Sequence, residues 1–303
     1  MKTHKAFNMV SKKQLRLFFL LTGLALFSSC GHLIHLDRAQ NSFNRGATLE
    51  NQLRFSPQTD ISASPSTHYT LAYAELDKAL NNKKGLSADN VLGTAYTIKA
   101  LCEWKLGLYG KAEKSASDAL DELEKMEKGG IRLPRDKALM KALPALMEIG
   151  RMKDTLYAFH RSAPSFEAGK AHCLEFIYDP DPDKMARLEK AIWKIADVQS
   201  SVASNEELSA YFIMSQLAGL KTWSDTNDFL FTCITKDPAL DPQTNRAARV
   251  KANEWVDEQV KAFEHFLKEK KPVEQLRLLI PDERGQAMAN RWAQLLGVAE
   301  DEE

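Results

Sequence analysis

The chain has 303 residues, of which 44% are hydrophobic and 27% charged, as expected for a globular protein of one or two domains. Its 41 basic and 41 acidic residues balance, but residues 1–29 hold five of the basic residues and no acidic one. The remaining 36 basic and 41 acidic residues leave a net charge of −5. This balance argues against nucleic acid as a partner, and against adhesion to anionic lipid beyond any anchor.

The first thirty residues have the three parts of a secretory signal. A basic start is followed by an apolar run from Leu17 to Phe27, and small residues then precede Cys30. The apolar run is about eleven residues long, whereas a helix that spans a membrane needs roughly twenty. A cleaved signal over residues 1–29 is therefore favoured over an uncleaved anchor.

The end of this segment, Leu26-Phe27-Ser28-Ser29-Cys30, resembles the lipobox of bacterial lipoproteins, although Phe27 stands where that family prefers an aliphatic residue. In that family the cysteine is lipidated and becomes the new N-terminus. The resemblance therefore implies lipid on Cys30 and a place in the bacterial cell envelope. Gly31 follows instead of the aspartate that favours the inner membrane, which implies the outer membrane, facing the periplasm. Secretion without lipid is the alternative.

Helical spacing begins shortly after Cys30. Apolar residues at steps of three and four predict a helix over residues 36–53. Serines and prolines predict a connection over residues 55–67. A second helix is predicted over residues 71–80, where the apolar face consists of Ala72, Leu76, Ala79 and Leu80.

Residues 96–120 predict two helices that meet at Gly107. Ser87 is an N-cap residue type and is expected to start the first helix. Gly107 can adopt a positive φ angle and end it, and the short turn makes the pair antiparallel. Small residues on the second helix allow two helix axes to approach closely. They repeat, 40 residues later, the spacing seen over residues 71–80, and the stripe comprises Ala112, Ala116, Ala119, Leu120, Leu123 and Met126.

This helix pair resembles a tetratricopeptide repeat, a 34-residue unit of two antiparallel helices that stacks into a right-handed solenoid. Lys99 and Glu103 depart from the family, because they fall where it has apolar residues, and Ala116 departs because the family prefers a large residue there. A register with one more residue in the turn would place Ile98 and Cys102 at the apolar positions but lose the match at Ala100. The residues that match are Gly107 and Tyr109 in the turn, Ala112, Ala119 and Leu120 in the second helix, and Tyr96 and Ala100 in the first.

In that family the first helix of each repeat lines a concave face that binds peptides. Carried over from the turn at Gly107, this face would consist of Thr97, Leu101, Trp104 and Lys105. A tryptophan beside a lysine suits peptide binding. Packing of Trp104 in the core explains the residue equally well.

Residues after the central pair predict more helices. Gly129 and Gly130 end the pair, and Pro134 is expected to open a helix that Pro144 kinks or breaks. Residues 162–165 predict a loop and a domain boundary.

The region beyond this boundary carries further start signals. A helix with an apolar stripe is expected from Met185 to Val202, and Ser204 with Glu207 forms a capping box for the next one. The remaining helices are expected at residues 166–178, 229–234, 241–271, 276–280 and 287–296, with Val256, Val260, Phe263 and Leu267 facing the core from the longest.

No stretch has the alternation of a β-strand, so the predicted fold class is all-α with about ten to twelve helices. The expected organisation is a signal peptide (1–29), a tetratricopeptide-like domain (30–161) and a C-terminal helical region (162–303).

Motifs for catalysis, phosphate binding and metal binding are absent from the sequence, so no catalytic residue, cofactor or metal site is predicted. His32 and His35 are expected in a membrane-proximal tether. Cys102, Cys173 and Cys233 form no C-x-x-C pair and are expected to be buried thiols, with one disulfide as the alternative.

These features predict a non-catalytic, lipid-anchored envelope protein whose helical body binds another envelope protein or a peptide. Two alternatives stay open. Some periplasmic lipoproteins with tetratricopeptide folds have a similar layout and serve transporters, which would make the protein a small-molecule receptor. Acidic residues in a helical body could also serve an enzyme that acts on the cell wall, but no local sequence identifies them.

Overall fold

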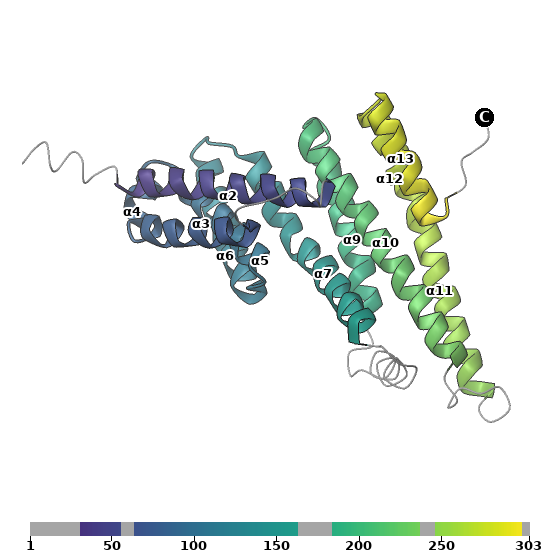
Figure 1. The fold of residues 1–303 in the computed structure, drawn as a ribbon. Coiled ribbons are helices and arrows are strands. Elements are labelled where there is room, and N and C mark those ends of the chain that lie inside the picture. The colour runs from purple at the N-terminus through teal and green to yellow at the C-terminus, as the bar shows by residue number, and fades with distance from the viewer. Residues whose placement is uncertain (1–30, 56–63, 163–183, 237–245, 299–303) are drawn as a thin grey trace, which may run out of the picture. The chain divides into compact units, whose positions relative to one another are not determined.

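The computed structural model describes residues 31–55, 64–162, 184–236 and 246–298, and in these ranges the chain is helical without any strand (Figure 1). The described ranges contain ten helices of eight residues or more and one further helix of six. The all-α prediction is therefore confirmed. Successive helices pack as antiparallel pairs, and these contacts divide the chain into a first unit that ends at Leu133 and a second that starts at Pro134.

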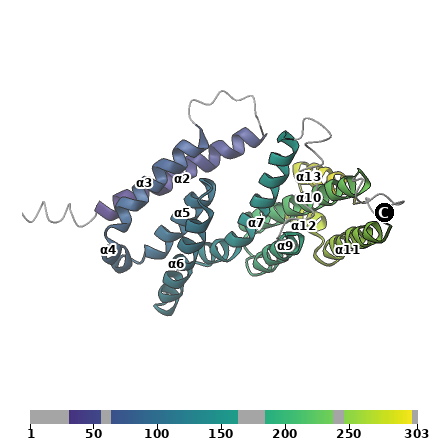
Figure 2. The same cartoon turned by 90° about the horizontal axis from the view of Figure 1, so that it is seen from below.

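The first unit consists of two helix pairs. Helix α2 packs along α3, α5 packs along α6, and α3 also contacts α5, as Figures 1 and 2 show. The short helix α4 lies in the connection between the pairs, which explains why the repeated spacing returns after 40 residues and not after 34. The helices are α2 (Gly31–Phe55), α3 (Pro65–Leu80), α4 (Lys83–Ala88), α5 (Leu92–Lys105) and α6 (Tyr109–Lys128).

Small residues bring the paired helices close together. The side chains predicted for the contact faces of α3 and α6 are almost all buried. Helix α5 crosses α6 at Gly93. A Cβ atom on this residue would lie 2.9 Å from Leu123 Cδ2, so any other residue would force the Leu123 side chain or a helix to move. The matched spacing in the two second helices is therefore a packing pattern. Its buried members are Ala72, Leu76, Ala79, Leu80, Ala112, Ala116, Ala119, Leu123 and Met126.

Helix α5 begins later than predicted. Ser87 lies inside α4, and the chain then turns at Asn90, which has a φ angle of 57°. The amide of Val91 donates to the carbonyl of Leu86 at 2.9 Å, which closes the end of α4. The prediction that Ser87 caps α5 is wrong, because the asparagine accepts the left-handed conformation that stops one helix before the next begins.

The turn at Gly107 is as predicted. Gly107 has a φ angle of 74°, and the amide of Leu108 donates to the carbonyl of Glu103 at 2.8 Å. The amide of Gly107 donates to the carbonyl of Trp104 at 3.0 Å, which completes a Schellman motif. Positive φ in this motif is where glycine costs least.

The second unit is arranged around the longest helix, α10 (Glu206–Lys236). This helix contacts every other helix of the unit, and Figure 1 shows it running beside α9 and α11. Phe212, Leu217, Leu220 and Trp223 of α10 are fully buried. The other helices are α7 (Pro134–Ser162), α9 (Lys184–Ser200), α11 (Arg246–Lys270), α12 (Pro272–Leu279) and α13 (Glu283–Leu296).

Of the two outcomes expected at Pro144, a kink or a break, the break does not occur, and α7 is a single helix. Two other details of this unit differ from the prediction. The cap of α10 is Asn205, whose Oδ1 accepts from the amide of Leu208 at 3.0 Å, one residue later than the predicted Ser204. Residues 229–234 form no separate helix, because no proline or glycine interrupts the last third of α10.

The core face of α11 is also shifted. Val256 is buried as expected, but Val260 is 40% exposed and Phe266 is fully buried in its place. Phe266 lies against Trp193 of α9 with ring centroids 4.8 Å apart and planes at 77°. This aromatic contact selects the buried face, since edge-to-face pairs add stability beyond their buried area.

Some predictions fall outside the described residues. They are the signal segment 1–29 with Cys30, the helix over 166–178, the start of a helix at Asp241, and the side chains of Cys173 and Cys233. None of the described helices combines the length and the hydropathy that crossing a membrane requires.

Candidate functional site

The predicted binding face lies on α5, between α3 and α6. Thr97 is only 3% exposed, and its hydroxyl is buried without a hydrogen-bond partner. Leu101, Trp104 and Lys105 are partly exposed. The open part of the predicted face is therefore the C-terminal turn of α5, and Thr97 belongs to the interior.

Three helices meet at this end of α5 through the carboxylate of Glu50. Lys105 Nζ donates to Glu50 Oε1 at 2.7 Å, and the Tyr69 hydroxyl donates to Glu50 Oε2 at 2.6 Å. The same ammonium lies 4.6 Å from the centroid of the Trp104 ring. Glu50 comes from α2, Tyr69 from α3, and Trp104 with Lys105 from α5, so this Glu50 cluster ties both helix pairs together.

The Glu50 cluster holds an aromatic ring and a cation at a partly open surface. The Lys105 and Glu50 side chains are 24% and 29% exposed, so water partly screens their charges. A cation over an indole stabilises both side chains in one arrangement. The indole is thereby held in place before any partner arrives, which lowers the entropy that binding would cost.

A buried acid lies on the opposite side of the same helix end. Glu103 is 1% exposed, its Oε1 lies 3.7 Å from Lys99 Nζ, and its Oε2 is buried without a hydrogen-bond partner. Burial raises the pKa of the Tyr73 phenol, and the charges of Asp77 and Glu103 raise it further. Burial raises the pKa of the neighbouring Cys102 thiol to about 12, with a further contribution from Glu103.

Sequence reasoning noted Glu103 and Lys99 only as departures from the repeat family. This departure could have indicated a buried ion pair, because a charged residue at an apolar position is either exposed or paired in the interior. Here it is paired with Lys99 and lies beneath Tyr73. Cys102 is a free, buried thiol, as predicted for that residue.

The prediction that His32 and His35 lie in a tether is wrong. His35 Nδ1 lies 2.7 Å from Glu75 Oε2 of α3. Asn82 uses its oxygen to accept from the Gly85 amide, so its Nδ2 donates to His32 Nδ1, 3.2 Å away. His32 Nε2 consequently donates to Asp89 at 2.7 Å. The first turn of α2 is thus fixed to α3 and to both ends of α4.

The second unit contains a buried polar stripe on α10. Gln216, Trp223 and Asn227 lie on one face at steps of seven and four. Both amide atoms of Gln216, the indole nitrogen of Trp223 and Oδ1 of Asn227 are buried without a hydrogen-bond partner. Such groups cost stability unless water or another polar group satisfies them. The Trp223 ring packs edge-to-face against Phe263 of α11, with ring centroids 5.9 Å apart.

Among the described residues, no three His, Cys, Asp or Glu side chains are grouped so that they could hold a metal ion. The most completely built surface feature of the predicted face is the Glu50 cluster with Trp104. Comparisons of the chain with protein-family models, with curated proteins and with solved structures found no match.

Proposed function

We propose that the protein is a non-catalytic, lipid-anchored protein of the bacterial envelope that binds another envelope protein or a peptide. Its body would be a tetratricopeptide-like, right-handed solenoid. The observation that carries this proposal is the partly open Trp104 ring, held by Lys105 where α2, α3 and α5 meet. A rigid aromatic residue beside a cation is a frequent anchor of protein interfaces.

The anchor in this proposal rests on the sequence. Residues 1–29 have the order of a signal peptide, and Leu26 to Cys30 resemble a lipobox. Two or more acyl chains hold a protein firmly, because each buried methylene contributes about 0.8 kcal/mol. The location that follows is the periplasmic face of the outer membrane.

In-cell crosslinking tests this proposal. The lipidated protein would be crosslinked in living cells, purified by affinity and examined by mass spectrometry for enriched envelope proteins. We expect Trp104→Ala to lower the recovery of the main partner at least about fivefold, since hot-spot truncations cost about 1 kcal/mol or more. Leu71→Ala is the matched control, because Leu71 is an apolar side chain of the same unit that is 52% exposed.

Cys30→Ala controls the location. Loss of membrane fractionation in this variant supports lipidation at Cys30, and unchanged fractionation contradicts it. Equal recovery of the partner with Trp104→Ala and with Leu71→Ala would reject the binding face. If no envelope protein is enriched from wild-type cells, the scaffold function itself is wrong.

A further inference from the structure

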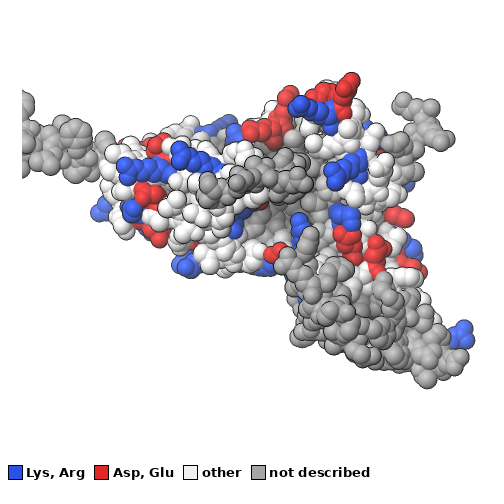
Figure 3. All heavy atoms as spheres, in the orientation of Figure 1, with Lys and Arg blue, Asp and Glu red and all other residues white. Residues whose placement is uncertain are grey.

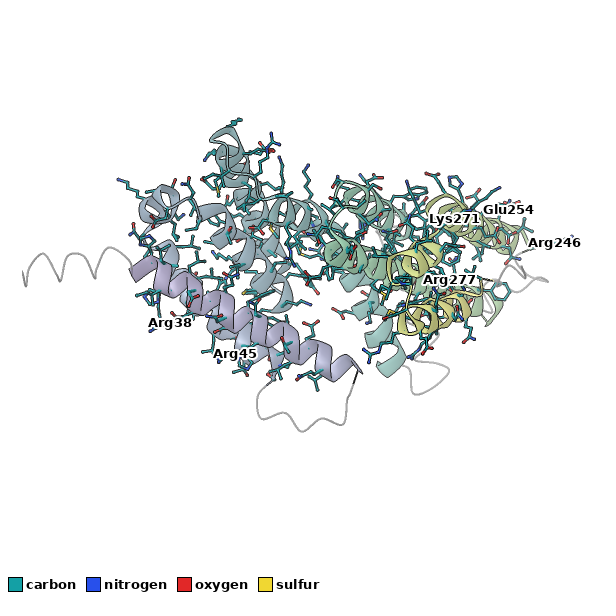
Figure 4. The ribbon with its side chains drawn as sticks, turned by 90° about the horizontal axis from the view of Figure 1, so that it is seen from above. Arg38, Arg45, Arg246, Glu254, Lys271 and Arg277 are labelled. Atoms are coloured by element: carbon teal, nitrogen blue, oxygen red, sulfur yellow. The ribbon has the colours of Figure 1, made fainter. Side chains whose placement is uncertain are left out.

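One face of α2 is open to solvent along most of its length. Ile34, Arg38, Asn41, Arg45 and Thr48 follow one another at steps of four, three, four and three, and all five are exposed. We call these five residues the outer face of α2. Figure 4 shows Arg38 and Arg45 on the same side of the helix, pointing away from the other helices of the unit.

The two arginines of the outer face are available for a partner. In the described part of the chain, neither Arg38 nor Arg45 has a hydrogen bond or an ion pair. The neighbouring acid Asp37 accepts a hydrogen bond from Asn41 at 3.1 Å, and Glu50 is bound by Lys105 and Tyr69. None of the five residues is acidic, and the exposed Asp37, bonded to Asn41, borders this face as its nearest acid in sequence. Figure 3 shows basic side chains over the first part of α2, on the side turned to the viewer, with acidic side chains beside them.

The start of α2 places this face close to the proposed anchor. The helix begins at Gly31, the residue after Cys30, and His32 is bonded to α4. No spacer therefore separates the packed body from a lipid on Cys30. Measured along the helix axis from Gly31, Arg38 lies about 10 Å away and Arg45 about 21 Å away, at 1.5 Å per residue.

These distances decide how α2 meets a charged surface. The electrostatic field of a membrane decays over a Debye length of about 8 Å at physiological ionic strength. A helix that stands upright on its anchor holds both Arg38 and Arg45 beyond this range, whereas a helix that lies along the surface brings both arginines into it. Each basic residue close to an anionic surface raises binding roughly fivefold, so two favour the flat arrangement about 25-fold.

We propose that the outer face of α2 is a membrane-docking surface that binds the phosphate groups of anionic phospholipids. The guanidinium group of arginine suits phosphate, because it donates two parallel hydrogen bonds. Ile34, 49% exposed, adds an apolar contact near the anchored end. The net charge of −5 is no obstacle, since only the charges within a Debye length of the surface act on it.

The orientation rests on the anchor of the proposed function, but binding of the outer face to lipid can be tested without it. The mature-length chain, residues 30–303 with Cys30→Ser, would be sedimented with phosphatidylcholine vesicles that contain either no phosphatidylglycerol or 50% of it. We expect binding only to the anionic vesicles, and its loss at 0.5 M salt.

Two charge-reversal variants separate the outer face from net charge. Arg38→Glu with Arg45→Glu is expected to lower the partition constant at least 20-fold. Lys128→Glu with Arg132→Glu makes the same charge change at exposed positions of the same unit and is expected to lower it less than threefold. Arg38→Gln with Arg45→Gln should fall between them, and circular dichroism checks that all variants keep their helix content.

Three results would overturn the docking surface. They are equal binding to neutral and anionic vesicles, equal loss in the two charge-reversal pairs, and no binding of the wild-type chain to anionic vesicles at low salt. A fourth result would also reject the proposal: if the Arg38 and Arg45 variants bind anionic vesicles like the wild type but recover less of the crosslinked partner, the outer face belongs to a protein interface. Because this chain carries no acyl group, failure of lipidation at Cys30 leaves the vesicle result unaffected.

Discussion

Single residues explain where the helix pairs differ from a regular repeat. Glu103 is 1% exposed and has one carboxylate oxygen without a hydrogen-bond partner, and its compensation consists of Lys99 Nζ at 3.7 Å and a hydrogen bond with the Tyr73 phenol. Removing a charge from water costs several kcal/mol, which a pair this loose returns only in part. An apolar residue at position 103 would pack the core of α5 better. Glu103 is therefore not explained by stability alone.

Replacement of Glu103 by methionine tests this interpretation. We expect Glu103→Met to stabilise the first unit by about 1 to 2 kcal/mol, because hydrophobic replacements of buried ion pairs are often neutral or stabilising. Lys99→Met should destabilise it, since the carboxylate then stays buried without its cation. Chemical denaturation measures both, and a loss of stability in Glu103→Met would show that the carboxylate is structurally needed.

The Glu75 carboxylate links stability to pH. Hydrogen bonding from Lys78, and then from His35, lowers the pKa of Glu75 below its ordinary value of 4.5. A lowered pKa in the folded state gives stability that is present above the unfolded pKa and lost as the pH falls through the folded one. We therefore expect wild-type stability to fall more steeply than that of Glu75→Gln below about pH 5.

Denaturation at several pH values between about 3 and 7 measures this difference. Glu124→Gln is the matched control, because Glu124 is an exposed glutamate of the same unit without an ion pair in the described residues. The loss of its stability at low pH should follow that of the wild type. If the stability of all three proteins falls in parallel as the pH is lowered, Glu75 makes no contribution.

Elements were predictable where one feature dominates the local chain. Gly107, Pro134 and the apolar stripe beginning at Met185 identified helix ends and a buried face correctly, because positive φ, proline geometry and helical periodicity are local properties. The start of α5 and the buried face of α11 were missed, because a left-handed Asn90 and the contact of Phe266 with Trp193 depend on neighbours distant in sequence or on a rarer backbone choice.

The candidate site divides in the same way. Trp104 and Lys105 could be selected from the turn at Gly107, since residues on one helix face follow from the register alone. Their partner Glu50 could not, because it lies 55 residues before Lys105 on another helix. Thr97 has the right register but lies in the interior, which only the packing of α3 and α6 around α5 reveals.

Close crossings between helices make some glycines irreplaceable. A Cβ atom on Gly219 of α10 would lie 2.8 Å from Ile192 Cγ1 of α9 and 2.9 Å from Ile149 Cδ1 of α7. We expect Gly219→Ala to destabilise the second unit by about 1 to 3 kcal/mol, the usual cost of overpacking. Thermal unfolding followed by circular dichroism measures this change.

Gly150 of α7 supplies the control. A Cβ atom there meets nothing within 4 Å, so Gly150→Ala should gain about 0.5 to 1 kcal/mol from helix propensity. Both substitutions replace glycine by alanine within a helix. Opposite changes in stability would therefore be due to the close crossing at Gly219. Stabilisation by Gly219→Ala would mean that the three helices can separate slightly without loss.

At the scale of the molecule, each unit has its own core. In the first unit, buried side chains from α2 to α6 pack among themselves, and the Glu50 cluster joins its two helix pairs. Domains of about 100 residues commonly fold alone. The division at Leu133 therefore separates a part of the chain that contains both the predicted binding face and the outer face of α2.

We accordingly expect residues 31–133 to fold as an isolated fragment. The fragment should be monomeric and helical by circular dichroism and should unfold in one cooperative transition. Lys105→Ala should lower the midpoint of thermal unfolding of the fragment, because Glu50 would keep its bond with Tyr69 but lose the ammonium of Lys105. An exposed lysine on α6, Lys111, provides the control substitution Lys111→Ala.

An unfolded or aggregated fragment would mean that the first unit depends on residues after Leu133 for its stability. The binding face and the outer face of α2 would then have to be studied only in the full chain. A folded fragment that still captures the crosslinked partner would place recognition within residues 31–133, whose described helices are α2 to α6.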